Sequence, residues 1–209
     1  MDSTITVSEL ERGLETVASP NKKQHTNSDT WLIVGLGNPG DKYANTRHNV
    51  GRMVIGELLD RQVPAASLNT HKKTNTDIAE VKIAGRKVVL AQPRTFMNVS
   101  GGPVQQLAAF FKIPAENIIV AYDDLEGDPG AVKLRQSGGD KGHNGLKSIT
   151  KSLGTKDYWR LSCGIGRPPG RMDPAAYVLK PFPKSEAAEV AIMCADAADE
   201  VERTLGVGN

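Results

Sequence analysis

Trp31-Leu-Ile-Val-Gly-Leu-Gly-Asn-Pro-Gly40 is an apolar run that ends in a glycine-rich turn. An apolar run without alternating polar residues is typical of a strand that is covered on both faces, as in a parallel or mixed sheet. Residues 50–62 then place apolar side chains at helical spacing, which predicts an amphipathic helix. A buried strand, a turn and a helix in this order indicate an α/β protein.

The rest of the chain continues to alternate between strands and helices. Two β segments, 77–83 and 87–92, are joined by Ala84-Gly85-Arg86 and predict a hairpin. Ser100 is expected to cap the helix that follows it. The fold predicted is a single α/β domain, in which a twisted mixed sheet, mostly parallel, has helices on both faces. The other expected elements are strands at 118–122, 131–135 and 159–165 and helices at 100–111, 144–153 and 184–205.

The first 30 residues differ from the rest in composition. They carry five acidic and three basic residues, and residues 19–30 contain no strong hydrophobe. We therefore expect 1–30 to be a flexible extension and 31–209 to be the folded domain. The extension lacks the features of a signal or transit peptide, and no apolar run is long enough to span a membrane. These features predict a cytoplasmic protein.

Net charge and cysteine content narrow the class of protein only slightly. A formal net charge of +2 neither requires nor excludes a nucleic-acid partner. Cys163 and Cys194 lack metal-ligand spacing and are expected to be buried thiols in a reducing compartment. His71 and His143 also lack ligand-spaced partners, so no metal site is predicted.

The glycine-rich turn has the pattern of a dinucleotide-binding loop. Gly35-Leu-Gly37-Asn-Pro-Gly40 matches G-x-G-x-x-G and follows a strand. However, Pro39 has no N–H to offer a phosphate, and the helix at 50–62 stands where a second strand should end in an acidic residue. A tight turn that presents Asn38 is the preferred interpretation, although Asn38 could also serve the turn alone.

Five polar residues occupy places where an α/β sheet usually forms its site, beyond the carboxyl ends of its strands. They are Asn38 after the first strand, His48 before the first helix, Asn98 after the hairpin, Asp123 at the end of 118–122, and Asn144 at a helix start. An imidazole with an unperturbed pKa of about 6.5 can take a proton from water, and a carboxylate can fix its tautomer. No Ser or Cys stands in a nucleophile motif, so water is the expected attacker. The alternative is that His48 and Asp123 only cap local structure.

Five motifs together resemble the bacterial-type peptidyl-tRNA hydrolase family. These are Ile33-Val-Gly-Leu-Gly-Asn-Pro-Gly40, Thr46-Arg-His-Asn49, Thr95-Phe-Met-Asn98-Val-Ser-Gly101, Asp123-Asp-Leu125 and Gly142-His-Asn-Gly-Leu146. Gly164-Ile-Gly-Arg-Pro168 extends the resemblance, which covers residues 31–205 in order. It implies an esterase that hydrolyses peptidyl-tRNA and recycles tRNA, usually as a monomer, without a metal or another cofactor.

The resemblance also implies roles for individual residues. His48 would activate water, Asp123 would hold it in its basic form, and Asn38 would separate blocked from free aminoacyl-tRNA. The acceptor stem and 3′ end of the tRNA, or its peptide, would contact Tyr43, Phe96, Met97, Asn98 and Asn144.

The sequence departs from the family at a pair of basic residues that would hold a tRNA phosphate. Arg135 matches the first, but the second position is Ser162, so either Arg160 or Arg167 compensates or the phosphate clamp is weaker. Two other functions stay open. A non-catalytic RNA-binding relative would have no need of the His48–Asp123 pair, and a nucleotide-binding enzyme would use the glycine loop.

Overall fold

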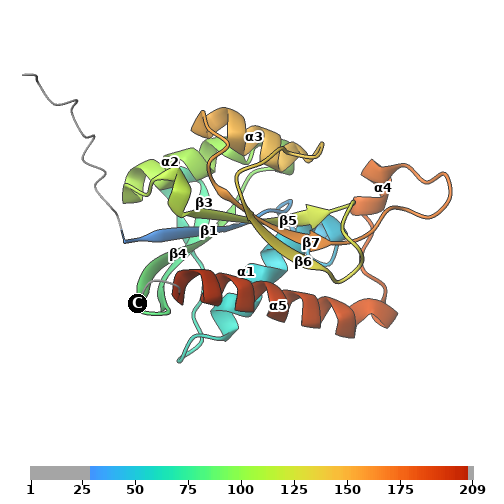
Figure 1. Ribbon diagram of the computed structural model, residues 1–209, viewed down its shortest axis with the longest axis horizontal. Coiled ribbons are helices and arrows are strands. Elements are labelled where there is room, and N and C mark those ends of the chain that lie inside the picture. Colours follow the sequence, from blue (N-terminus) through green and yellow to red (C-terminus); the bar gives the residue numbers. More distant parts are fainter. Residues whose placement is uncertain (1–28, 207–209) are drawn as a thin grey trace, which may run out of the picture.

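The computed structural model describes residues 29–206, which form a mixed sheet between two layers of helices (Figure 1). The sheet of this described part has seven strands in the order β2-β3-β4-β1-β5-β7-β6. Neighbouring strands are parallel from β4 through β1 and β5 to β7, and antiparallel at both edges. The strands are β1 (Trp31–Gly35), β2 (Asn69–His71), β3 (Thr76–Ile83), β4 (Arg86–Pro93), β5 (Ile118–Asp124), β6 (Val132–Gln136) and β7 (Trp159–Gly164).

Helices cover both faces of the sheet, as predicted. In Figure 1, α1 and α5 lie on one face, α2 and α3 on the other, and the short α4 projects at one end of the molecule. None of the helices within residues 29–206 is long and apolar enough to cross a membrane. Their bounds are α1 (Val50–Asp60), α2 (Gly101–Phe111), α3 (Asn144–Leu153), α4 (Pro174–Val178) and α5 (Ala187–Gly206).

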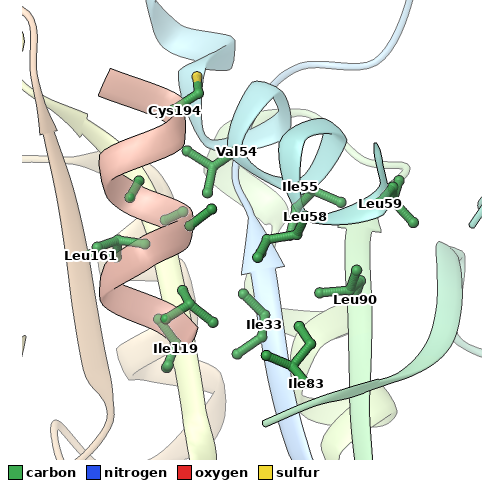
Figure 2. Packing of buried hydrophobic residues seen from close by; sticks show 14 of the residues in the cluster. Ile33, Val54, Ile55, Leu58, Leu59, Ile83, Leu90, Ile119, Leu161 and Cys194 are labelled. Carbon is green, nitrogen blue, oxygen red and sulfur yellow. The ribbon is translucent and has the colours of Figure 1, made fainter. Parts of the chain in front are cut away.

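The core has two layers, because successive side chains of a strand point to opposite faces. Ile33 of β1 packs with Leu58 of α1 and Cys194 of α5 in the layer shown in Figure 2. Leu32 and Val34, on either side of Ile33, belong to the layer beneath α2 and α3. Full burial of each such side chain is worth about 1.5–3 kcal/mol. This two-sided burial is the reason for the continuous apolar run at 31–34.

Two glycines allow α1 to cross the sheet at very short range. A Cβ atom on Gly51 would lie 2.3 Å from the carbonyl oxygen of Ala121, and one on Gly35 would lie 2.3 Å from that of Gly51. Any larger residue would push the start of α1 away from β1 and β5. The close approach places the 3₁₀ turn η3 (Arg47–Asn49), which precedes α1, next to the end of β5.

The structure confirms the predicted hairpin, formed by β3 and β4, and the buried, free state of both cysteines. Ser100 occupies the N-cap position of α2, as expected, but its hydroxyl donates to the carbonyl of Met97 and makes no capping hydrogen bond. The short β2 and α4 were not predicted, since segments of three and five residues carry too little periodicity. The predicted extension lies outside the described residues except for Asp29 and Thr30.

Candidate active site

A cavity of about 520 Å³ opens at the carboxyl ends of β1, β4 and β5. This is the edge of the sheet at which the sequence placed the polar residues. The predicted residues that line it are Asn38, His48, Phe96, Met97, Asn98, Asp123 and Asn144. Tyr43 reaches this group through its ring, which makes an edge contact with Phe96 at a centroid distance of 6.3 Å. Seven predicted site residues, which span more than 100 positions, therefore share one cavity.

His48 and Asp123 form a hydrogen-bonded pair in this cavity. Nδ1 of His48, in η3, lies 2.9 Å from both carboxylate oxygens of Asp123, at the end of β5. A carboxylate can only accept, so Nδ1 carries the proton and donates it. In the neutral imidazole, Nε2 on the other side of the ring is then the nitrogen without a proton, the form that proton abstraction requires.

His143 is a second partner of Asp123 that the sequence analysis missed. Its Nε2 lies 2.9 Å from Oδ1 of Asp123, while its Nδ1 accepts the backbone N–H groups of Gly145 and Leu146 at the start of α3. Because Nδ1 accepts, the proton sits on Nε2 and is donated to the carboxylate. The side chain is only 7% exposed. His143 stands directly before the predicted Asn144, and that position was the signal available in the sequence.

The two imidazole donors control the ionisation of Asp123. Burial by itself would raise the pKa of this carboxyl. The electrostatic effect and hydrogen bond of His143, together with the hydrogen bond of His48, outweigh burial and hold the pKa of Asp123 well below its ordinary value. Asp123 therefore stays ionised at neutral pH.

The sequence shows no ligand-spaced partner for His143, but the fold brings two potential metal ligands next to it, which corrects that inference. One ligand atom each of His48, Asp123 and His143 lie within 4.8 Å of one another, a set that could hold a metal ion. Sequence spacing does not reveal this set, because its members come from three separate elements. The 2.9 Å N···O contacts are hydrogen-bond lengths, shorter than the roughly 3.3 Å between two ligand atoms that share a tetrahedral zinc at about 2.0–2.1 Å each. Proton sharing accounts for the geometry as it stands.

Asn38 serves the turn and also faces the cavity. Its Oδ1 accepts the N–H of Met97 at 2.8 Å, which ties β1 to the segment after β4. Its backbone N–H and carbonyl bond the side chain of Asn49, each at 2.9 Å. With Oδ1 committed, the amide NH₂ group is the polar edge of Asn38 available to a ligand.

The glycine loop is not arranged as a phosphate cradle. The N–H of Asn38, which would face a phosphate in such a loop, is bonded to Asn49. Side-chain atoms of Arg52 and Asn49 press against Gly37, where a Cβ would lie 2.7 Å and 2.8 Å from them. The space beside the loop is therefore filled by the protein itself, which argues against the nucleotide-binding alternative.

The cavity also has an apolar lining, part of which comes from a segment that the sequence analysis did not mark. Leu125 follows β5, and Val178 and Leu179 come from the end of α4. Phe96, which is 55% exposed, adds an aromatic ring to this lining. Tyr122 also contributes, and burial raises the pKa of its phenol to about 12, so the phenol is neutral at physiological pH. The cavity thus joins a proton-transfer group to an apolar surface.

Arg135 lies outside the cavity, on the edge strand β6. It pairs in register with Arg160, and Lys133 two residues earlier pairs with Ser162. Arg160 is 4% exposed, donates to the carbonyls of Lys156 and Tyr158 and stacks on the Tyr158 ring.

Arg167 is exposed but bonded to Glu126. The expectation that Arg160 compensates for Ser162 therefore conflicts with its burial, whereas Lys133 and Arg135 are both exposed on the same face of β6.

Comparison with known proteins adds independent evidence. Residues 32–208 match the sequence profile of a family described as peptidyl-tRNA hydrolase. The chain is 59% identical over 182 residues to peptidyl-tRNA hydrolase 1 of Corynebacterium glutamicum, covering 87% of this chain and 99% of that one. It is also 59% identical over 174 residues to peptidyl-tRNA hydrolase of Corynebacterium diphtheriae, covering 83% and 95% respectively.

Solved structures agree with the sequence comparison. A crystal structure of a peptidyl-tRNA hydrolase in complex with N-propanol superposes with a TM-score of 0.78 at 35% identity, covering 86% of this chain and 89% of that one. The crystal structure of peptidyl-tRNA hydrolase from Acinetobacter baumannii has a TM-score of 0.72 at 32% identity, covering 86% and 96%. The likeness therefore extends over the whole sheet and its helices.

Proposed function

The chain belongs to the peptidyl-tRNA hydrolase family, and we propose that His48 and Asp123 carry out its reaction. That reaction is hydrolysis of the ester between a peptide and the 3′ end of a tRNA, which releases both. The observation that carries the assignment is the 2.9 Å pair between His48 Nδ1 and the ionised Asp123 carboxylate at the cavity. It leaves one basic nitrogen, Nε2 of His48, for the chemistry.

The reaction follows from this arrangement. Nε2 of His48 takes a proton from water as the water oxygen attacks the ester carbonyl carbon. The imidazolium that forms is stabilised by Asp123. Collapse of the tetrahedral intermediate breaks the bond to the ribose oxygen, which receives the proton back from His48. The free peptide acid and the tRNA hydroxyl are the products, so the protein ends the cycle unchanged.

His143 supports this mechanism as a positioning residue. Its Nδ1 caps α3, so its ring cannot turn without losing two backbone hydrogen bonds. Its Nε2–H therefore holds Oδ1 of Asp123 in place beneath His48. A carboxylate with two fixed donors is preorganised to orient the base, in the way that second partners orient functional groups elsewhere.

The remaining cavity residues are proposed to receive the two ends of the substrate. The amides of Asn98 and Asn144 can donate to and accept from ribose hydroxyls or peptide groups. Phe96, with Tyr43 against its edge, offers an exposed ring for a base or an apolar side chain, and Met97 adds a buried apolar contact.

The direct test of the function uses N-acetylaminoacyl-tRNA and the same aminoacyl-tRNA without the acetyl group. A peptidyl-tRNA hydrolase releases tRNA from the first and spares the second. A non-catalytic RNA-binding relative would bind both without releasing tRNA. Parallel titration with NAD should leave the melting temperature unchanged, because protein side chains occupy the space beside the glycine loop.

Arg135 and Lys133 are proposed to bind a phosphate of the acceptor stem. Replacing Arg135 with alanine should raise KM several-fold with little change in kcat, since a phosphate contact positions the RNA without entering the chemistry. The plot of log affinity against log salt concentration has a negative slope, and its magnitude should decrease by about one, as expected for one lost phosphate contact. Salt titrations of tRNA binding measure this slope.

The matched control for this prediction is Arg203→Ala. Arg203 is also exposed, but its guanidinium is bonded to Glu200 of the same helix, outside the cavity lining. It should change neither the salt slope nor KM by more than about twofold. Equal effects of the Arg135 and Arg203 substitutions would mean that general positive charge, and not a phosphate site on β6, attracts the tRNA.

Residues 1–28 are proposed to be dispensable for hydrolysis. The family match begins at Leu32, and the described active-site residues all lie from Asn38 onward. Deletion of 1–28 keeps Asp29, whose carboxylate pairs with Arg86 at 2.6 Å. We expect kcat/KM within about twofold of the full chain and an unchanged melting temperature. A large loss of activity at a preserved melting temperature would show that the extension belongs to the site.

We further propose that the protein works as a monomer in the cytoplasm without a metal or other cofactor. The family resemblance supports a monomer that needs no metal or other cofactor. The proton transfers described above need only the side chains of His48 and Asp123 and one water molecule.

A further inference from the structure

Arg47, which precedes the proposed base His48, forms hydrogen bonds with a part of the chain that is distant in sequence. Tyr177–Phe182, which we call the strap, runs from α4 toward α5 and lies against residues 45–47. Thr46 forms an isolated antiparallel β-bridge with Pro181. The N–H of Arg47 donates to the carbonyl of Lys180 at 3.1 Å, and the N–H of Phe182 donates to the carbonyl of Asn45 at 2.9 Å. The backbone on both sides of the contact is thus paired.

The side chain of Arg47 completes this contact. Its guanidinium donates to the carbonyl of Pro181 at 2.9 Å and to both carboxylate oxygens of Glu186 at 3.2 and 3.3 Å. It also lies between two rings, 4.6 Å from the centroid of Tyr177 and 5.1 Å from that of Phe182. Arg47 therefore holds both ends of the strap at once.

Stability alone does not account for a guanidinium at this place. The Arg47 side chain is only 8% exposed, and its Nε has no hydrogen-bond partner among the described residues. A buried charge with one unpaired donor is often no more stabilising than an apolar side chain of similar size. A planar group with fixed donors does, however, hold its partners in one geometry.

What Arg47 holds in place is one wall of the active-site cavity. Val178 and Leu179, within the strap, line the cavity, and His48 follows Arg47 directly in the chain. We propose that Arg47 is a positioning residue for substrate binding, which keeps the Val178–Leu179 wall at the right distance from His48 to receive the apolar side chain of the esterified amino acid. This proposal rests on the proposed function.

The test compares Arg47→Lys on two substrates that carry the same tRNA. Lysine keeps the charge but cannot bond Pro181 and Glu186 in the same fork or stack between the two rings. For N-acetylleucyl-tRNA we expect KM to rise roughly tenfold, as for the loss of an apolar pocket contact, with kcat within about threefold. For N-acetylglycyl-tRNA, which has no side chain to touch the wall, KM should stay within about twofold.

A double-mutant comparison tests whether Arg47 acts through the wall. Leu179→Ala should also raise KM for the leucyl substrate, and adding Arg47→Lys to it should change KM by less than about twofold. Independent sites would instead show additive effects. If Arg47→Lys is unstable, Glu186→Gln, which weakens one of the Arg47 contacts, should shift KM for the leucyl substrate in the same direction.

Arg61→Lys is the matched control. Arg61 joins α1 to α5 through Glu57, Asp199 and Glu202, far from the cavity lining. It should lower the melting temperature and leave the ratio of the two KM values unchanged. The proposal is overturned if Arg47→Lys affects both substrates equally, acts on kcat alone, or adds fully to Leu179→Ala. Failure of the parent protein to cleave either substrate would instead refute the proposed function.

Discussion

Replacing His48 with alanine should lower kcat for N-acetylaminoacyl-tRNA by about 10²–10⁴, the usual contribution of a positioned general base. The variant retains the cavity but loses Nε2 of His48, and both ring nitrogens of the remaining His143 are committed to Asp123 and to the start of α3. Substrate affinity should change little, because the proposed contacts to the tRNA and peptide come from other residues. Single-turnover hydrolysis and tRNA binding, measured on the same preparation, separate the two effects.

His71→Ala provides a matched control for the loss of an imidazole. His71 lies at the end of β2 and packs on Phe110 at a centroid distance of 4.6 Å, outside the cavity lining. This variant should keep kcat within about twofold. If His48→Ala also hydrolysed the substrate within a few-fold of the parent, another group would have to be the base. The His48–Asp123 pair would then serve only to anchor η3 to the sheet.

Asn38→Asp should reduce kcat/KM for the blocked substrate by about 10²–10³, the cost of losing a donor to a developing oxyanion. One carboxylate oxygen can still accept the N–H of Met97, so the turn should survive. The other oxygen would replace the NH₂ group that faces the cavity. A donor would thus become a negative charge, which repels the anionic oxygen of the tetrahedral intermediate.

The same substitution should narrow the preference for blocked over free aminoacyl-tRNA. A neutral amide site rejects the ammonium of the free substrate, because that group loses hydration without gaining a counter-charge. Aspartate at position 38 would supply the counter-charge. The measurement is kcat/KM for acetylated and unacetylated substrates, with Asn69→Asp on the exposed β2 as control. An unchanged ratio in Asn38→Asp would mean that Asn38 serves the turn and that discrimination lies elsewhere.

The fold could be predicted from the sequence to a large extent, because burial leaves a direct trace in residue order. The two-sided burial of β1 appears as the apolar run at 31–34, and the one-sided burial of α1 appears as helical spacing at 50–62. The β3–β4 hairpin was evident for the same reason. Short elements were missed or misread. α4 has five residues, and the hydroxyl of Ser100 bonds backward to Met97 instead of capping α2.

The candidate site was predictable in its residue types and in the edge of the sheet where they gather. Parallel strands end at one edge, so residues that follow β1 and β5 had to come close together. The second hydrogen-bond partner of Asp123, His143 before α3, was not predictable, because a search by spacing along the chain cannot find a partner that comes from another element. The same limit hid the burial of Arg160, which results from the packing around β7.

The sequence by itself thus determined the alternation of buried strands and amphipathic helices, the family and the polar residues His48, Asp123, Asn38, Asn98 and Asn144. Hydrophobic periodicity and motif order are local properties, so they can be read along the chain. Only the tertiary structure decided which atoms meet. It placed two imidazoles on one carboxylate, committed Oδ1 of Asn38 to Met97, and brought the strap against Arg47 from more than 130 residues away. Those contacts depend on how the sheet and helices pack, and close packing is a property of the whole domain.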